Sequence, residues 1–232
     1  MLVDLDAKAL EWVAAVFLSQ DEVGMKELWD DEDQHGLNQT YLTLPSRLVA
    51  KKFLFRMIFG GTNYANDAEF FEVSRKEEFW QEIIAKFYRK YKGLQAWHDK
   101  LVEHVALKGW TQIPTGRVFT YPKQRVLDRP AILNYPVQGL GAEIMSLARV
   151  VLWNYLRDRY SNQEVVWICT VHDSILWDVN DQKVSIPEFG KDLKEGWNTI
   201  PDEFEKRFGV EFNVPLRCEV KVGKDWKNQT EA

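Results

Sequence analysis

Two apolar runs rich in β-branched residues, VVWICTV and SILWDV, stand on either side of a polar pair, His172 and Asp173. Apolar runs of this kind that meet at a short polar junction predict a β-hairpin. The alternating run PLRCEVKVG predicts a further strand near the C-terminus, and apolar and acidic residues alternate over residues 2–7. These segments therefore predict an antiparallel sheet that carries a carboxylate at a strand junction.

Helical periodicity covers most of the remaining sequence. Pro45 and Ser46 form a helix start signal for residues 47–59, and Gly60 with Gly61 stops that helix. No repeat, low-complexity tract or linker marks a domain boundary, which favours one continuous unit. The chain is thus predicted to be an α+β domain with an antiparallel sheet and several helices. Besides 47–59, the predicted helices cover residues 10–17, 76–91, 94–108 and 134–160, the last entered through Pro136. A short hairpin is predicted over 111–121, and an acidic helical stretch is predicted before PLRCEVKVG.

Composition favours a globular protein and excludes several other classes of protein. With 232 residues, 45% of them hydrophobic, the chain can bury a globular core. Cys169 and Cys218 are too few and too far apart for a disulfide framework or a zinc knuckle. The sequence contains no apolar run of about 18 residues and no secretory signal, so we expect a cytoplasmic protein without a membrane partner.

Charge is distributed unevenly along the chain. The formal net charge is −5, so a net basic field does not indicate nucleic acid. Residues 47–56, 86–92 and 117–129 are nevertheless locally basic, whereas residues 178–211 are mostly acidic. A cationic face on an acidic chain is compatible with a phosphate polymer as ligand, although each basic segment alone is equally compatible with a solvated surface.

Asp6 and Asp173 are candidate metal ligands. Asp6 ends a short predicted strand and Asp173 lies in the hairpin turn, so two sheet ends can present both carboxylates to one cation site. Magnesium typically takes only one or two protein carboxylates together with substrate phosphates. Spacing alone is weak support, because an aspartate in a turn is usually a turn residue.

Arg47, Lys51, Phe55 and Phe59 follow one another at intervals of four residues. This spacing places two cations and two rings along one broad helix face. An arginine can grip phosphate oxygens bidentately, a lysine adds a point charge, and a ring one turn further can stack on a base. The alternative is an amphipathic helix whose rings pack in the core.

The same helix carries a family resemblance. RLVAKKFLFRMIFGG resembles the motif B helix of family A DNA polymerases, the bacterial polymerase I type and its phage relatives. VDLDAKALE resembles motif A, TVHDSI resembles motif C, and ILNYPVQGLGAEIMSLA resembles the Asn-x-x-x-Gln helix that follows the fingers. Four motifs in the family order are a strong signal. Together with weaker similarities between them, the resemblance extends over essentially all 232 residues. The chain is most similar in character to a phage replicative enzyme.

The resemblance implies an α+β polymerase palm with an antiparallel sheet and helical fingers, lacking a thumb and an exonuclease domain. Residues 1–30 would form palm, residues 31–125 fingers with the motif B helix, and residues 126–232 palm again. The implied partners are primer-template DNA, deoxynucleoside triphosphates and an N-terminal polymerase fragment that carries thumb and exonuclease. If a phage encodes the protein, we expect it in the cytoplasm of a bacterial host.

The resemblance also assigns roles to individual residues. Asp6 and Asp173 would be the catalytic ligands of two Mg²⁺ ions, with the main-chain carbonyl of Ala7 completing one shell. The implied reaction is nucleotidyl transfer from a dNTP to a primer 3′-hydroxyl. The implied dNTP-binding residues are Glu11, His35, Arg47, Lys51, Phe55 and Phe59, with Glu11 as the gate against a 2′-hydroxyl. The implied primer or template contacts are Asn134, Gln138, His172 and Arg129.

Departures from the family pattern leave alternatives open. Ser174 stands where many members carry Glu, and Pro130 stands where an Arg is frequent, beside Arg129. One alternative is a palm-type RNA polymerase, against which Glu11 and the Asn-x-x-x-Gln helix argue. The other is a non-catalytic DNA-binding or assembly subunit that retains the polymerase fold.

Overall fold

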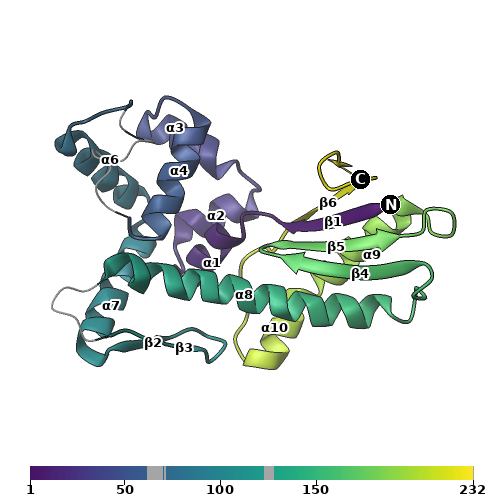
Figure 1. The fold of residues 1–232 in the computed structure, drawn as a ribbon. Helices are drawn as coiled ribbons and strands as arrows, with labels where there is room; N and C mark the ends of the chain where they lie inside the picture. The colour runs from purple at the N-terminus through teal and green to yellow at the C-terminus, as the bar shows by residue number, and fades with distance from the viewer. Residues whose placement is uncertain (62–69, 71, 123–127, 232) are drawn as a thin grey trace. The chain divides into compact units, whose positions relative to one another are not determined.

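The computed structural model describes residues 1–61, 70, 72–122 and 128–231 (Figure 1). The chain forms two compact units, one made of Met1–Leu10 with Leu140–Ala232 and the other of Glu11–Gly139. Both divisions fall within helices, which explains why no linker signature announces them and why one continuous unit was the wrong expectation. The predicted division into palm and fingers segments remains a prediction, and its boundary between residues 125 and 126 lies outside the described residues.

The described residues form strands and helices, and the bounds of each type follow in chain order. The strands are β1 (Leu2–Ala7), β2 (Trp110–Gln112), β3 (Val118–Thr120), β4 (Val165–Val171), β5 (Ser174–Val179), β6 (Cys218–Gly223) and β7 (Thr230–Glu231). The helices are α1 (Leu10–Ser19), α2 (Glu22–Trp29), α3 (Gln34–Leu42), α4 (Arg47–Ile58), α6 (Glu77–Lys90), α7 (Lys92–Lys108), α8 (Arg129–Leu156), α9 (Ile186–Asn198) and α10 (Ile200–Phe208).

The first unit is built on a five-stranded antiparallel sheet in the order β4-β5-β1-β6-β7. The predicted hairpin is confirmed as β4 and β5, and β1 lies between β5 and β6 (Figure 1). Val3 and Leu5 are fully buried, and alternation along β1 therefore directs Asp4 and Asp6 to the opposite face. The carboxylates of β1 thus share one face of the sheet.

The second unit is mainly helical and has an aromatic core. Trp12 of α1 contacts Tyr91 with ring centroids 5.1 Å apart, and Phe87 contacts the same tyrosine at 4.8 Å. Phe53 of α4 stacks on Trp80 of α6 at 6.3 Å. Burial of large apolar side chains contributes about 1.5–3 kcal/mol each, so this cluster holds the helices that carry the predicted nucleotide-binding residues.

The predicted helix over residues 47–59 is confirmed as α4. Ser46 caps its start, where the hydroxyl accepts a hydrogen bond from the Val49 N–H at 3.2 Å. Phe59 is the C-cap, and Gly60 follows in the left-handed region at φ 69°. Two helices, α2 and α3, were not predicted. Asp21 and Asp33 are their N-caps, whose side chains accept hydrogen bonds from N–H groups of the first turn.

The predicted helix over residues 134–160 begins earlier and ends earlier, as α8. The Asp128 carboxylate accepts a hydrogen bond from the Ala131 N–H at 3.1 Å and so caps the helix. Pro130 occupies the first turn, where a missing N–H costs no hydrogen bond. This proline, rather than Pro136, is therefore the one at the entrance.

Pro136 lies inside α8 and cannot donate to the carbonyl four residues back, that of Ile132. The Tyr121 hydroxyl donates to this carbonyl at 3.4 Å. A tertiary hydrogen bond thus replaces the missing backbone bond, and local sequence patterns do not reveal this tertiary contact.

Buried His98 of α7 is expected to make the stability of the second unit depend on pH. Its Nδ1 lies 3.0 Å from the Tyr88 hydroxyl, and burial, aided by the charge of Arg129, lowers its pKa to about 3. The unfolded chain titrates near pH 6.5 and so binds more protons than the folded chain between about pH 6.5 and 3. Stability should therefore fall with falling pH in that window, by at most about 1.4 kcal/mol per unit.

Urea unfolding at about pH 7 and pH 5 measures this dependence. His98→Gln should flatten it, whereas His104→Gln, on the exposed surface of the same helix, should leave it unchanged. An equal pH dependence in the parent chain and in His98→Gln would contradict the assignment.

Candidate active site

Asp6 and Asp173 come together at the ends of two neighbouring strands of the first unit. The β1–β5 register pairs Asp6 with Ser174, so Asp173 lies one residue beyond this pair. The Ala7 N–H donates to the Asp173 carbonyl at 2.9 Å and fixes the hairpin turn against the end of β1. Pairing between segments 167 residues apart, from Asp6 to Asp173, thus creates the pair of carboxylates.

The electrostatics of this pair favour a cation. Burial raises the pKa of Asp6, the negative charge of Asp173 raises it further, and Asp4 and Glu219 add smaller effects. Lys221 of β6 opposes them. Carboxylates that repel one another on one sheet face are stabilised when a divalent ion neutralises them.

The residues present suit magnesium shared with a ligand. Two carboxylates and the main-chain oxygen of Ala7 can supply the protein's part of an octahedral oxygen shell. In the described part of the chain, no group of three or more His, Cys, Asp or Glu side chains is placed to hold a metal. The donor set therefore fits an ion that phosphate oxygens complete, rather than a protein-only cage.

His172 occupies the tip of the β4–β5 hairpin with an exposed side chain. Its φ is 54°, in the left-handed region, where histidine is found several times more often than most residues. This conformation closes the tight turn that brings Asp173 back toward β1. The predicted adjacency of His172 and Asp173 at a strand junction is thereby confirmed.

A buried polar cluster beside the site was missed at the level of sequence. Asp4 is 5% exposed, and its carboxylate accepts hydrogen bonds from the Ser174 hydroxyl and, at 3.1 Å, from the Trp226 indole N–H. The alternation of Asp4 with Asp6 along a strand was the available signal. The cluster accounts for Ser174 physically, because a glutamate there would place a second anion against a buried carboxylate.

The predicted cationic helix face is found in the second unit, on α4. Arg47 donates from Nε and Nη2 to the two oxygens of Asp33, each at 2.8 Å. Lys51 lies 5.8 Å from the centre of the Phe55 ring, which stacks on Phe59 at 6.2 Å. Both rings are half-buried, so they belong to a surface face and not to the core.

His35 of α3 joins this face. Its ring centre lies 6.1 Å from that of Phe55, and its buried Nδ1 has no hydrogen-bond partner among the described residues. Burial lowers its pKa, and the charges of Arg47 and Lys51 lower it further. A ring nitrogen beside two cations is suited to an anionic ligand, which would supply the missing partner.

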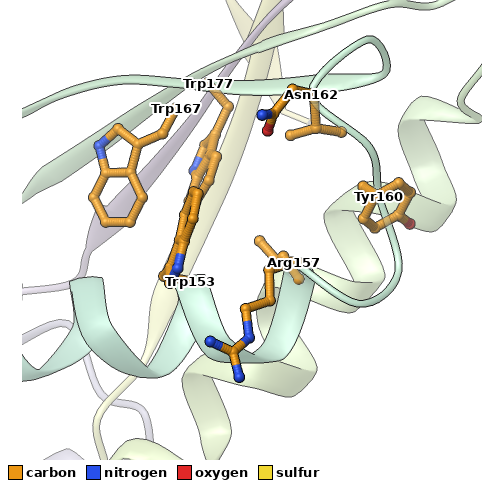
Figure 2. A pocket seen from close by; sticks show the side chains of 8 residues that line it. Trp153, Arg157, Tyr160, Asn162, Trp167 and Trp177 are labelled. Carbon is orange, nitrogen blue, oxygen red and sulfur yellow. The ribbon is translucent and has the colours of Figure 1, made fainter.

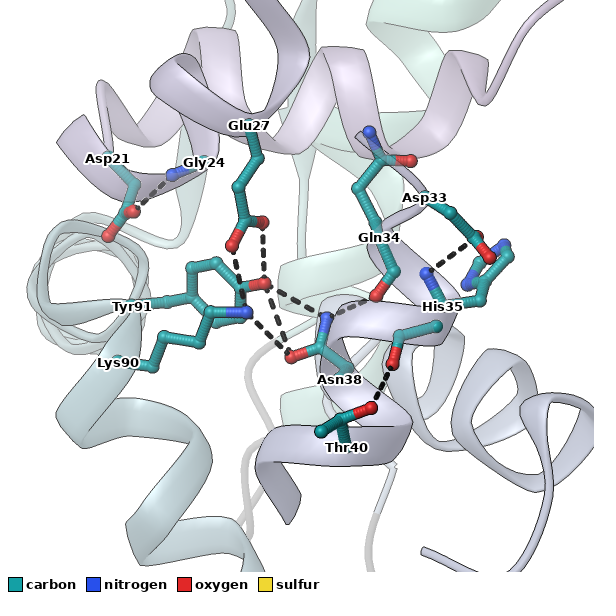
Figure 3. A network of polar contacts seen from close by, with 11 residues as sticks. Asp21, Gly24, Glu27, Asp33, Gln34, His35, Asn38, Thr40, Lys90 and Tyr91 are labelled. Carbon is teal, nitrogen blue, oxygen red and sulfur yellow. Dashed lines mark hydrogen bonds and ion pairs between the residues drawn. The ribbon is translucent and has the colours of Figure 1, made fainter. Parts of the chain in front are cut away.

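Asp33 is a site neighbour that the sequence did not single out. Its side chain caps α3 by accepting a hydrogen bond from the His35 N–H at 3.2 Å (Figure 3). The same carboxylate also binds Arg47 bidentately. The hydrogen bonds from Arg47 lower the pKa of Asp33 below its usual value. One carboxylate therefore orients both the histidine-bearing helix and the arginine of α4.

Four further predicted residues also lie in the second unit. Glu11 is half-buried in the first turn of α1, and Gln138 is exposed one turn after Asn134 on α8. The Asn134 Oδ1 is buried without a partner among the described residues. Arg129 pairs with Asp99 at 4.0 Å. The structure thus groups the predicted residues by unit, with the metal ligands in the first and most nucleotide and primer residues in the second.

Comparison with known proteins identifies the family of this chain. The family model described as DNA polymerase family A matches residues 1–228. The chain belongs to DNA polymerase family A. Family membership confirms the resemblance inferred from the four motifs.

Individual relatives have low sequence identity to this family A chain, but the similarity extends over nearly all of its length. DNA polymerase I of Caldicellulosiruptor bescii is 25% identical over 97% of this chain and 26% of its own length. Thermostable DNA polymerase I of Thermus aquaticus is 23% identical over 100% of this chain and 27% of its own length. The chain therefore spans about a quarter of these curated relatives.

A solved structure shows the same fold. The polymerase domain of Pol1 from M. smegmatis, in complex with DNA primer-template and dNTP, aligns with a TM-score of 0.80 at 18% identity. The match covers 97% of this chain and 40% of that one. The predicted α+β class, an antiparallel sheet with helices, is thereby confirmed as that of a family A polymerase domain. No helix within the described ranges has both the length and the apolarity needed to cross a membrane.

Proposed function

We propose that this family A chain catalyses template-directed DNA synthesis by nucleotidyl transfer from a dNTP to a primer 3′-hydroxyl. The observation that carries the proposal is that Asp6 and Asp173 lie at one end of the sheet, where the Ala7 N–H donates to the Asp173 carbonyl. The family match supports the same activity. DNA synthesis needs no side-chain nucleophile, so two suitably placed carboxylates are a sufficient catalytic contribution.

Asp6, Asp173 and the carbonyl of Ala7 would hold two magnesium ions. When bound, such ions lower the pKa of an attacking hydroxyl and neutralise charge on a pyrophosphate leaving group. The two carboxylates fix where the cations and the phosphates they carry can lie. Because the Ala7–Asp173 backbone bond fixes the hairpin turn against the end of β1, the sheet would hold the two carboxylates close to each other.

The α4 face would bind the incoming nucleotide. Arg47, Lys51 and His35 would contact the triphosphate, and Phe55 would stack near sugar and base, with Phe59 closing the pocket. Asp33 accepts hydrogen bonds from Nε and Nη2 of Arg47 and so orients the guanidinium before a phosphate binds, which would reduce the side-chain entropy lost on binding. Glu11 would exclude a 2′-hydroxyl and so select deoxyribose.

Asn134, Gln138, His172 and Arg129 would contact the primer terminus and the minor groove. Minor-groove acceptors are common to all correct base pairs, so such contacts check pairing without reading sequence. The M. smegmatis neighbour was solved with DNA primer-template and dNTP, which supports these ligands for the present chain. Since the chain spans about a quarter of its curated relatives, we propose that a further polypeptide segment supplies thumb and exonuclease functions.

Primer extension tests the proposed function. A primed DNA template is incubated with magnesium and dNTPs, using this chain alone and then together with a polypeptide that carries a family A thumb. Extension in either mixture supports DNA synthesis, and a parallel reaction with ribonucleotides tests the sugar preference. Absence of extension in both mixtures would refute the proposal, and equal use of ribonucleotides would refute the role of Glu11.

Arg47→Gln is expected to raise the KM for dNTP by about 10- to 100-fold, because a hydrogen-bonded charge contributes about 1.5–3 kcal/mol. Steady-state extension at varied dNTP concentration measures the effect. Arg89→Gln, which removes an exposed arginine from α6 in the same unit, is the matched control and should leave the KM unchanged. Equal KM values for Arg47→Gln and the control would exclude Arg47 from nucleotide binding.

A further inference from the structure

A cavity of about 220 Å³ lies in the first unit, away from every residue proposed above for catalysis. The end of α8, the loop after it and the strands β4 and β5 form its walls (Figure 2). Pockets for drug-sized ligands measure about 300–1,000 Å³, so this one suits a single large side chain. The cavity is lined by Trp153, Leu156, Arg157, Tyr160, Asn162, Val165, Trp167 and Trp177.

The lining combines aromatic rings with unused hydrogen-bond donors. Trp167 and Trp177 pack with ring centroids 4.7 Å apart, and Trp153 is 48% exposed (Figure 2). Trp177 itself is 2% exposed, yet its indole N–H has no partner among the described residues. Buried donors without a partner are rare in native proteins, so a ligand with an acceptor would satisfy this one.

Arg157 gives the cavity its charge. Its side chain is 54% exposed, and the ion pair it makes with Asp158, at 3.8 Å, is long and solvent-accessible. The guanidinium thus stays available to a carboxylate at the cavity rim. Of the side chains that line the cavity, Arg157 is the cationic one, whereas a nucleic-acid strand requires a series of cations along its backbone.

The strand next to the cavity is open to pairing. β4 is the outermost strand on its side of the described sheet, and Val166 and Ile168 on it are 48% and 47% exposed. Edge strands offer unpaired N–H and C=O groups to an added strand. Trp167 belongs both to β4 and to the cavity wall, so a strand added here could place alternate side chains into the cavity.

We propose that the β4 edge and this cavity bind an extended peptide segment of a protein partner. The segment pairs with β4, inserts a large apolar or aromatic side chain among the tryptophans, and sets a carboxylate two residues away against Arg157. The edge of the described sheet matches the backbone of such a peptide, and the cavity volume matches its large side chain. The Trp177 N–H, which has no partner among the described residues, matches an acceptor, and Arg157 matches the carboxylate. The proposal is independent of the polymerase activity, because no residue proposed for catalysis lines the cavity.

Isothermal titration of this chain with capped heptapeptides tests the proposal. The peptides alternate Thr and Val, with Phe, Trp, Leu or Ala at the centre and Glu or Gln two positions later. Peptides with a large centre and Glu should bind best, and Trp153→Ala should weaken them about tenfold or more, as expected for an aromatic anchor. Arg157→Gln should remove the preference for Glu over Gln.

Arg159→Gln is the matched control, because Arg159 is exposed two residues further on and does not line the cavity. Its affinities should equal those of the parent chain. Three results would overturn the proposal: no measurable binding by any peptide, binding insensitive to Trp153→Ala, or Trp153-dependent binding of oligothymidylate without peptide binding. The last result would assign the cavity to nucleic acid.

Discussion

Asp6→Ala and Asp173→Ala are each expected to abolish primer extension while the first unit stays folded. Each change removes one of two carboxylates that meet at the β1–β5 strand ends, and with it one of the proposed ligands for the cations. Metal ions contribute several kcal/mol of charge stabilisation in such reactions, so the rate should fall by about a thousandfold or more. The rate is measured by single-turnover extension at saturating dNTP.

The fold should survive these substitutions for a physical reason. Burial raises the pKa of Asp6 and the negative charge of Asp173 raises it further, so alanine at either position removes an unfavourable interaction between the two carboxylates. Asp181→Ala, an exposed turn residue after β5, is the control and should extend primers normally. Near-normal extension by Asp6→Ala would refute the proposed catalytic role, whereas loss of the circular dichroism spectrum would mean that Asp6 is structural.

Lys90→Met is expected to destabilise the second unit by about 3–5 kcal/mol, the range for breaking a buried ion pair. The Lys90 Nζ lies 2.8 Å from the Glu27 Oε1, and the two side chains are only 13% and 10% exposed. The Tyr91 hydroxyl donates to the other oxygen of Glu27 at 2.8 Å and also contacts Asn38 (Figure 3). Methionine would fill the space of the lysine but leave Glu27 charged, buried and without its cation.

Urea unfolding of Lys90→Met beside the double variant Glu27→Gln/Lys90→Met separates the two causes of instability. The double variant should recover part of the loss, because it removes the uncompensated charge. Lys26→Met breaks an exposed pair with Asp30 on α2 and should change the midpoint little. If Lys90→Met lowered the free energy of unfolding no more than Lys26→Met does, the buried network would have no structural role.

The network also connects stability with the proposed nucleotide site. Asn38 lies on α3, as does His35, and its amide donates to the Tyr91 hydroxyl at 2.9 Å. Tyr91 is fully buried between α6 and α7. The aromatic core thus holds the helix whose N-cap, Asp33, orients Arg47, so variants that loosen the network should also raise the KM for dNTP.

Local signals account for the elements that the sequence predicted correctly. Ser46 with a glycine pair bounded α4, and β-branched runs around a polar pair marked the β4–β5 hairpin. α2 and α3 were missed although Asp21 and Asp33 cap them, since short polar helices lack a clear apolar stripe. The start of α8 was misplaced because the role of Pro136 depends on Tyr121, a partner outside the helix.

The sequence by itself determined the α+β class, the four ordered motifs and the residue types of the candidate site. The class follows from local periodicity and capping, which depend on neighbours along the chain, whereas the motifs and the site residues follow from the resemblance to family A DNA polymerases. Only the tertiary structure decided that Asp4 is buried against Ser174 and Trp226, that Asp33 holds Arg47, and that Trp153 and Arg157 frame a cavity. Those contacts join separate helices, strands and loops, and they depend on burial and strand pairing that no local pattern encodes.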